Sequence, residues 1–442
     1  MFYYFSFNLA IFVARKLQKI FLIKKKNMKK LVLLLTLANC LTLWSQTVLR
    51  TQIYNPNIKT LQIGVVGEKL GLPVIELNTS DIIEVSLDEM SHKAHSYSYK
   101  VVHCNADWTP SNLSTTEYLA GFTTANITDY VLSVNTTFLY THYTFNLPNN
   151  EMSFKISGNY LVIIYEDNHP EKPIAQACFS IVEPKISVSA NIRGNTDTEL
   201  NGRFQQLDFD VNMNGYLVRD PNTEFKVVVR QNNRIDNQVY DVKPTYFSGS
   251  KLSYINNKAL IFEGGYEYHR FDISSVYAAG EGVETIRYKQ PHYDANLTEN
   301  KIQTSRIYMQ DLDVNGKFVI NLQSSDDDNV EADYMMVHFT LPSKAPYFDG
   351  QLYLGGEFNY NLLNDASRMK HDVNKGAYTN TLLLKQGGYN YQYWFLPKGA
   401  SKASAERVDG SYWQTKNEYT IYVYHRPWGE RYDKLVGVKT LE

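Results

Sequence analysis

Apolar and polar residues alternate along most of the chain, a pattern typical of strands that bury one face. Few windows show helical periodicity. Eight alternating runs stand out, at 82–87, 96–102, 159–165, 224–231, 317–322, 333–341, 380–385 and 418–426. Turn signals such as LPNN, SGN, DPN and NG separate them. Short strands at this spacing predict an all-β protein of antiparallel sandwiches rather than βαβ units.

Two interruptions of the pattern suggest domain boundaries. The strand-like run 177–184 closes with a proline, and a second break falls in 343–350. We therefore expect tandem immunoglobulin-like or early-set β-sandwich domains at 47–184, 185–345 and 346–442. The weakly patterned stretch from Ser274 to Lys301 is expected to be a long functional loop.

The start of the chain differs from the rest. Two lysines precede a short apolar run at 31–43, and Ser45 lies where a signal peptidase would cut. The run is shorter than the roughly 20 residues needed to span a bilayer. We expect a secretory signal peptide at 28–46 and a mis-assigned upstream start at 1–27. A genuine N-terminal membrane anchor is the alternative.

Composition changes this picture in two ways. The chain contains 34 Tyr and 21 Phe, and tyrosine suits half-buried pleated surfaces. The formal net charge of −2 gives no basic field for nucleic acid or anionic lipid. We therefore expect no nucleic-acid partner.

The hexapeptide HCNADW offers the side chains of a cysteine nucleophile with its base, namely His103, Cys104, Asn105 and Asp107. Neighbouring strand residues point to opposite faces, so His103 and Cys104 do not form the close pair that this chemistry needs unless a bulge re-aims one. We interpret the segment as structural, with Asn105 and Asp107 in a turn. Cys104 is then a core residue or half of a disulfide with Cys178, which an oxidising compartment permits.

Candidate metal ligands are incomplete. The segment DLDVNGKF matches the front half of an EF-hand loop, but Leu322 stands where a bidentate Glu is required. We expect Asn315–Gly316 to form a type I′ hairpin turn instead. His92 and His95 lack further ligands at matching spacing, and the acidic run 324–329 is expected to be a solvated loop. We predict no metal site and no cofactor.

The sequence carries no GxSxG, HExxH, Walker or GxGxxG motif, so we expect no catalytic residues and no small-molecule substrate. The segment NYQYW places Tyr391 and Tyr393 on one strand face and Trp394 on the other. Such a row could stack on sugar rings, or belong to a core or a protein interface. A carbohydrate-binding accessory protein that uses these residues is the alternative function.

The chain resembles the plug protein family of the type IX secretion system of Bacteroidota. The likeness is carried by YKVVHCNADWTPSNLSTTEYLAGF, ITDYVLSVNTTFLYTHYTFNLPN, SGNYLVIIYED, EFKVVVRQNNRIDN, GGYEYHRFD, DVNGKF, LLLKQGGYNYQYW and YWQTKNEYTIYVYHRPWGERYDKLVG, and it covers nearly all of the chain after residue 46. The segment after 345 also resembles the early-set modules of glycogen-binding proteins, a likeness that concerns the fold.

The family resemblance implies a periplasmic, non-enzymatic interaction protein. Its expected partner is the giant outer-membrane barrel of the translocon, whose periplasmic opening such a plug seals when no cargo is engaged. The family usually has an apolar or basic residue in place of Cys178, which implies that Cys104 does not generally serve in a disulfide.

Overall fold

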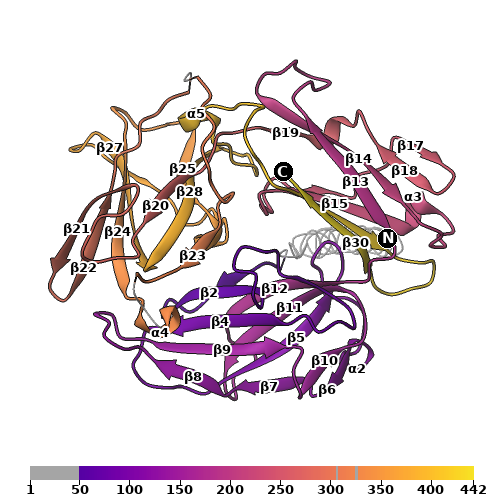
Figure 1. Cartoon of the computed structure of the whole chain (residues 1–442), viewed down its shortest axis with the longest axis horizontal. Helices are drawn as coiled ribbons and strands as arrows, with labels where there is room; N and C mark the ends of the chain where they lie inside the picture. Colours follow the sequence, from indigo (N-terminus) through magenta and orange to yellow (C-terminus); the bar gives the residue numbers. More distant parts are fainter. Residues whose placement is uncertain (1–48, 305–306, 324–326) are drawn as a thin grey trace, which may run out of the picture. The chain divides into compact units, whose positions relative to one another are not determined.

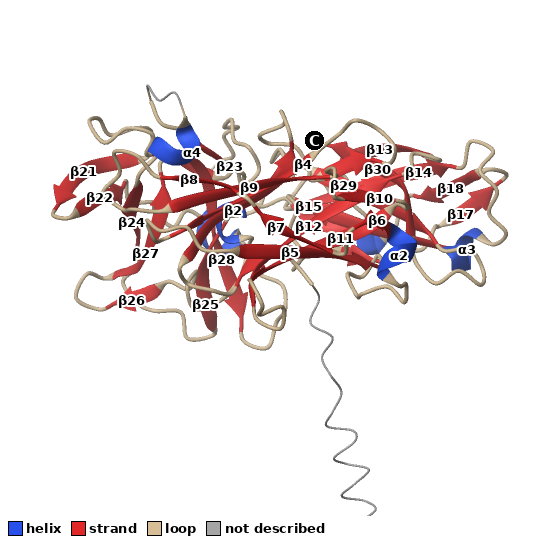
Figure 2. Ribbon diagram, turned by 90° about the horizontal axis from the view of Figure 1, so that it is seen from below, coloured by secondary structure: helices blue, strands red, loops and turns tan. Residues whose placement is uncertain are grey.

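The computed structural model describes residues 49–304, 307–323 and 327–442 (Figure 1). The expected upstream extension, 1–27, and signal peptide, 28–46, lie outside the described residues. The prediction of an all-β fold is confirmed, because the described chain forms several mainly antiparallel sheets. Its helices are short, as Figure 2 shows. They are α2 (Thr115–Tyr118), α3 (Pro221–Glu224), α4 (Asp328–Glu331), α5 (Glu406–Asp409) and the 3₁₀ turns η1 (Lys258–Leu260) and η2 (Glu357–Asn359).

The first lobe uses strands between residues 52 and 182. One sheet has the order β1 (Gln52–Ile53), β12 (Pro173–Val182), β11 (Gly158–Glu166), β5 (Tyr97–Cys104), β7 (Thr124–Ile127), with β3 (Val74–Glu76) parallel to β12. The other has the order β2 (Ile58–Val65), β4 (Ile83–Glu89), β9 (Thr141–Leu147), β8 (Asp129–Leu132). The strands β6 (Leu119–Gly121) and β10 (Met152–Phe154) pair separately. Alternate residues of the two sheets, among them Val85, Tyr143 and Val162, form one buried core.

The second lobe combines two distant parts of the chain. One sheet has the order β13 (Ser187–Arg193), β14 (Phe204–Asn212), β18 (Lys251–Tyr254), β17 (Tyr246–Ser248), with β19 (Ile261–Glu263) beside β14. The other has the order β16 (Val239–Tyr240), β15 (Phe225–Gln231), β29 (Tyr419–His425), β30 (Lys434–Leu441). In Figure 1 the yellow C-terminal strand β30 accordingly lies with the magenta strands of this lobe.

The third lobe holds the remaining strands. One sheet has the order β20 (His269–Asp272), β28 (Gly387–Pro397), β23 (Phe318–Ile320), with β25 (Gly350–Gly355) also paired to β28. The other has the order β21 (Val283–Lys289), β22 (His292–Leu297), β24 (Tyr334–Pro342), β27 (Ala377–Lys385), β26 (Lys370–Asp372), in which β22 and β24 run parallel.

The strand pairing corrects the expected division at 185–345 and 346–442. Because β29 and β30 join β15, the end of the chain completes the second lobe, and the third lobe is inserted between β19 and β29. Alternation identifies strands, but it does not say which distant strand each one pairs with.

The region from Ser274 to Lys301 is also corrected, because it forms the hairpin β21–β22 rather than a long loop. Both strands leave many residues of both faces partly exposed, which weakens their alternation. At Asn315–Gly316 the φ angles of 54° and 88° fit the expected type I′ turn. No strand precedes this turn at 311–313, however, so the expected hairpin is not formed there.

Candidate functional site: the junctions between the lobes

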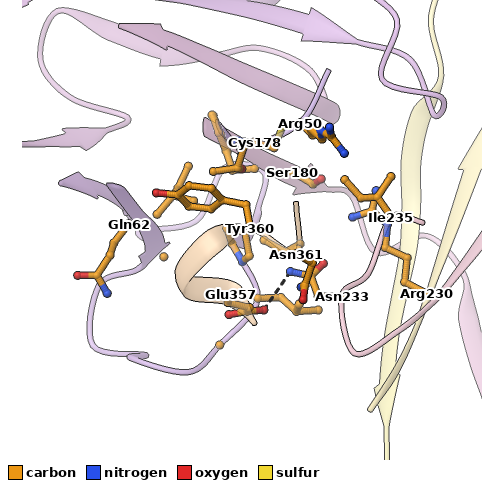
Figure 3. A pocket seen from close by; sticks show the side chains of 18 of the residues that line it. Arg50, Gln62, Cys178, Ser180, Arg230, Asn233, Ile235, Glu357, Tyr360 and Asn361 are labelled. Atoms are coloured by element: carbon orange, nitrogen blue, oxygen red, sulfur yellow. Dashed lines mark hydrogen bonds between the residues drawn. The ribbon is translucent and has the colours of Figure 1, made fainter. Parts of the chain in front are cut away.

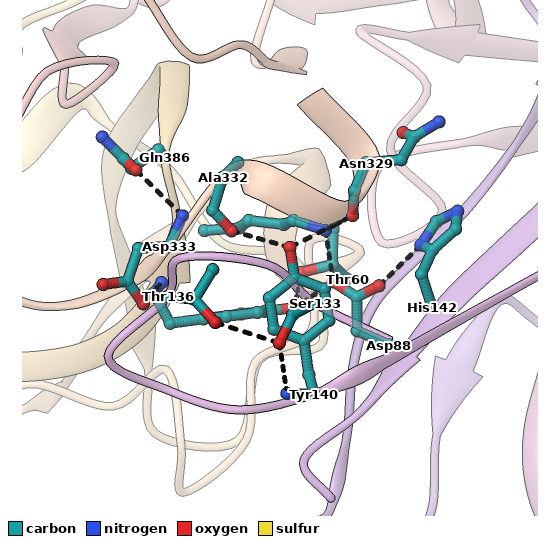
Figure 4. Close-up of polar contacts among 12 residues, drawn as sticks. Thr60, Asp88, Ser133, Thr136, Tyr140, His142, Asn329, Ala332, Asp333 and Gln386 are labelled. Carbon is teal, nitrogen blue, oxygen red and sulfur yellow. Dashed lines mark hydrogen bonds and ion pairs between the residues drawn. The ribbon is translucent and has the colours of Figure 1, made fainter. Parts of the chain in front are cut away.

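A buried ion pair joins the first and third lobes. Asp88 of β4 and Lys385 of β27 are almost completely buried, and the Lys385 ammonium donates to Asp88 Oδ2 over 2.7 Å. The Tyr334 hydroxyl donates to the same oxygen over 2.7 Å, and His142 Nδ1 lies 2.7 Å from Asp88 Oδ1. Figure 4 shows Asp88 and His142 within this network. The carboxylate therefore has three polar partners from three strands.

Opposite charges counteract the effect of burial on the pKa of each group in this pair. Burial alone raises the pKa of Asp88, but Lys385 and His142 outweigh it and bring the pKa below its ordinary value. Burial lowers the pKa of Lys385, and Asp88 opposes that shift. The ammonium also lies 4.3 Å from the centre of the Tyr140 ring, a cation–π contact.

The loop after β8 closes the same junction with backbone contacts. The Tyr140 hydroxyl donates to the Ala332 carbonyl over 2.8 Å, as Figure 4 shows. The carboxylate of Asp333 accepts from the backbone N–H groups of Thr137 and Phe138, over 2.8 and 3.0 Å. The first lobe is thus held to the third by fixed, directional bonds as well as by packing.

The hexapeptide HCNADW lies at the junction of the first and second lobes. The backbone N–H of Ala106 donates to Asp433 Oδ2 over 3.0 Å, and Asp433 is fully buried. Arg426 links the two segments, because its Nε donates to Asp433 Oδ1 over 2.7 Å and its Nη2 donates to Asn105 Oδ1 over 2.6 Å. Lys226 Nζ also reaches Asp433, over 3.1 Å. The hexapeptide therefore anchors the first lobe to the β29–β30 loop of the second lobe.

His103 packs as a neutral core residue rather than as a base. Burial lowers its pKa to about 4, and its ring contacts the rings of Tyr118, Tyr160 and Tyr432. A Cβ at Gly158, where φ is 138°, would collide with the His103 ring. The glycine thus lets the ring sit against the neighbouring strand.

The possible disulfide between Cys104 and Cys178 is not formed, and both thiols are free. Strand β11 lies between β5 and β12, because Leu161 is opposite Val102 on one side and Cys178 on the other. Two strand spacings amount to about 9.6 Å, beyond the roughly 7 Å between Cα atoms that a disulfide tolerates. Burial also raises the pKa of the Cys104 thiol, and raises that of Cys178 to about 12. Both thiols are therefore poor nucleophiles.

The aromatic row considered as a sugar or partner surface is buried. Tyr391, Tyr393 and Trp394 are 2%, 1% and 5% exposed. The two tyrosine hydroxyls donate to Asn300 Oδ1 over 2.6 and 2.9 Å. The guanidinium carbon of Arg234 lies 3.6 Å from the centre of the Trp394 ring, at the junction of the second and third lobes. The prediction of a partner or sugar surface at these residues is therefore corrected. They belong to the core and to a junction between lobes.

A second buried ion pair strengthens this last junction. Lys317, directly after the Asn315–Gly316 turn, donates to Glu418 Oε2 over 2.7 Å, and both side chains are almost buried. The third lobe is therefore joined to the first and to the second lobe by charged or cation–π contacts away from water.

A cavity of about 160 Å³ remains where residues of all three lobes meet (Figure 3). Cys178, Arg230 and Glu357 contribute to its lining. Burial raises the pKa of Glu357, whose carboxylate accepts from Asn233 Nδ2 over 3.2 Å. With a protonated thiol and a carboxyl held by an amide, the cavity has no evident nucleophile–base pair.

The histidines considered as ligands have separate partners. His95 Nδ1 lies 2.6 Å from Glu89 Oε1, and His92 Nε2 lies 3.0 Å from the Ser133 carbonyl oxygen. In the part of the chain that the structure describes, no group of three or more His, Cys, Asp or Glu could hold a metal ion. None of the described helices is long and apolar enough to cross a bilayer.

Sequence reasoning missed the residues that make the junctions, namely Asp88, Lys385, Asp433 and Arg426. A signal was present in part, because Asp88 follows the alternating run 82–87 and Lys385 ends the apolar run at 382–384. A charge buried in such a place requires a partner, but the identity of that partner depends on pairing between lobes.

Comparison with known proteins agrees with the expected family. Residues 58–183 match the family model described as type 9 secretion system plug protein 1st domain. The chain is similar to a hypothetical protein from Parabacteroides merdae ATCC 43184, solved by crystallography. The identity is 41%, the TM-score is 0.88, and the match covers 90% of this chain and 100% of that one. A second match, to native alpha-2-macroglobulin from Escherichia coli, has 11% identity and a TM-score of 0.17, and it covers 46% of this chain and 89% of that one. No curated protein matches.

Proposed function

Because the chain belongs to the type IX secretion system plug protein family, we propose that it is a periplasmic, non-enzymatic plug. It closes the periplasmic opening of the giant outer-membrane barrel of the translocon when no cargo is engaged. Cargo displaces it by competing for the same contact. The expected signal peptide at 28–46 supplies the route to the periplasm.

The observation that supports a plug is the fixing of each pair of lobes. The junctions of the third lobe contain the buried pairs of Asp88 with Lys385 and of Lys317 with Glu418. At the junction of the first and second lobes, Asn105 Oδ1 accepts from Arg426 and the Ala106 N–H donates to Asp433. Breaking a buried pair by removal of one partner costs about 3–5 kcal/mol, so independent movement of the lobes is strongly disfavoured. A body without internal hinges can block an opening, whereas a flexible string of domains would let solutes pass.

The buried aromatic row removes the residues on which the carbohydrate-binding alternative depended. Stacking on sugar requires an accessible ring face, and Tyr391, Tyr393 and Trp394 present none. We therefore retain the interaction protein as the single proposed function.

Affinity purification tests the proposal. The tagged protein, expressed at its native level, is recovered from detergent-solubilised outer membranes, and the giant barrel is expected to co-purify. A strain lacking the barrel is the control for non-specific recovery. Recovery of soluble glycan-processing proteins without the barrel would contradict the proposal.

A permeability assay tests closure itself. Deletion of the protein is expected to admit a large dye that the outer membrane normally excludes. Additional deletion of the barrel is expected to remove this leak, because the leak passes through the barrel. A leak that persists without the barrel would show that the protein does not act by closing it.

A further inference from the structure

The edge strand β8 exposes apolar side chains on both of its faces. All four of its residues are exposed, with Tyr130, Val131 and Leu132 at 49%, 47% and 38%. The loop that follows exposes Val134 and Leu139 as well. β8 is the outer strand of the sheet β2-β4-β9-β8, and Figure 1 shows it at the margin of the first lobe. Contiguous exposed apolar residues of this kind mark interaction sites.

The backbone of β8 has a free hydrogen-bonding side. The Ser133 N–H donates to the Tyr140 carbonyl, so by alternation the groups of Val131 face β9 and those of Tyr130 and Leu132 face outward. Among the described strands, β8 pairs only with β9. The Val134 N–H, next in the outward row, donates to the Val330 carbonyl of α4 over 2.9 Å. The outward-facing backbone groups of this segment therefore already bond to one element from elsewhere in the fold.

This edge lacks the usual protection against pairing. Natural edge strands carry lysine, proline or a bulge that discourages a further strand. The chain has no lysine or arginine between Lys100 and Lys155, and β8 pairs with β9 without a bulge. By contrast, the exposed edge strand β17 is followed closely by Lys251.

We propose that β8 is a docking strand, at which an extended segment of a type IX secretion component adds to the sheet as a fifth strand. This inference rests on the proposed function and names the surface through which the plug is held. Backbone bonds to Tyr130 and Leu132 supply the pairing, and the exposed side chains select a segment with alternating apolar residues.

Charge at the edge distinguishes between occupants. Asp129 is the single charged residue between 121 and 139, and α4 adds Asp328 and Glu331 beside Val134. A second copy of the chain would bring the same acidic residues to the edge, where like charges repel. The occupant is therefore a segment of another protein that carries lysine or arginine beside its apolar residues.

Two substitutions test the strand without altering its pairing to β9. Leu132→Pro removes an outward N–H, and Val131→Lys adds the missing protective charge. Phe247→Lys on β17 is the matched control, because Phe247 is also an exposed edge residue, at 51%. Each variant is first shown to keep the wild-type urea midpoint, and a Leu132→Pro protein that fails this condition is replaced by Leu132→Lys.

The assay is recovery of the giant barrel from solubilised outer membranes by full-length tagged protein. Both β8 variants are expected to recover at least about tenfold less barrel, equivalent to roughly 1.4 kcal/mol of binding free energy. The Phe247→Lys protein is expected to match the wild type. Undiminished recovery by the β8 variants overturns the docking strand and leaves the proposed function intact. Failure of the wild-type protein to recover the barrel overturns both.

Amide hydrogen exchange distinguishes strand addition from side-chain contact. In the purified complex the amides of Tyr130 and Leu132 are expected to exchange more slowly than in the free protein. Unchanged exchange overturns strand addition. A homodimer of the purified protein that Leu132→Pro dissociates overturns the choice of occupant.

Discussion

Replacing Lys385 by Met tests whether the buried pair with Asp88 holds the first and third lobes together. Methionine keeps most of the length of the side chain but removes the ammonium, so Asp88 loses its cationic partner in a buried site. Removing one partner of a buried pair costs about 3–5 kcal/mol. Since His142 and Tyr334 still bond Asp88, we expect the lower end, about 3 kcal/mol.

Urea unfolding of the purified protein, followed by tyrosine and tryptophan fluorescence, measures this loss. Lys243→Met is the matched control, because Lys243 forms an exposed pair with Asp241 at 2.8 Å and exposed pairs contribute about 0–1 kcal/mol. The double variant Asp88→Asn/Lys385→Met should lose less than the sum of the single losses, because neither charge is left alone. A Lys385→Met protein within about 1 kcal/mol of wild type would refute the reasoning.

The contribution of Asp88 to the free energy of unfolding should decrease at acid pH. The pKa of Asp88 is below its ordinary value in the folded state, so its contribution is present above the unfolded pKa of about 3.9 and is lost as the pH falls below it. The Asp88→Asn protein should therefore lose less stability than wild type over this acid range, as measured by urea midpoints.

Three further predictions concern single side chains. The pKa of His103 is about 4 when folded and about 6.5 when unfolded, so the unfolding free energy should fall by up to about 3 kcal/mol between pH 6.5 and 4; a His103→Asn protein with the same slope would contradict this. In denatured, unreduced protein lacking residues 1–46, a thiol reagent should titrate both Cys104 and Cys178, whereas a disulfide would leave neither reactive. Trp394→Ala should lower the unfolding free energy by about 3–5 kcal/mol in urea, and a loss below about 1 kcal/mol would argue against its buried position.

The sequence predicts the strands of this protein better than their partners. Alternation identified β15 and β29 as separate runs, because a half-buried strand carries its pattern within itself. Nothing local says that residues 225–231 pair with 419–425 across an inserted lobe. Domain boundaries read along the chain therefore fail where the chain leaves a sandwich and later returns to complete it.

The aromatic row illustrates a second limit. The pattern placed Tyr391 and Tyr393 together on one face of β28, and both do bond to Asn300. Trp394 lies on the opposite face. Whether that face meets solvent or a neighbouring lobe depends on what covers it, and the covering residue Arg234 lies in another lobe. Strand geometry fixes which residues share a face, whereas burial is decided by tertiary contacts.

The hexapeptide HCNADW connects these two limits with the function. Strand alternation separates His103 from Cys104, and the structure uses what remains, Asn105 and the N–H of Ala106, to bind the β29–β30 loop. That loop belongs to the segment that returns to close the second lobe. The bond from Ala106 to Asp433 therefore requires that β29 and β30 have taken their places in the second lobe. Fixing the first lobe in place is thus coupled to completion of the second, so a chain without β29 and β30 in place would lack the rigidity on which the proposed plug function depends.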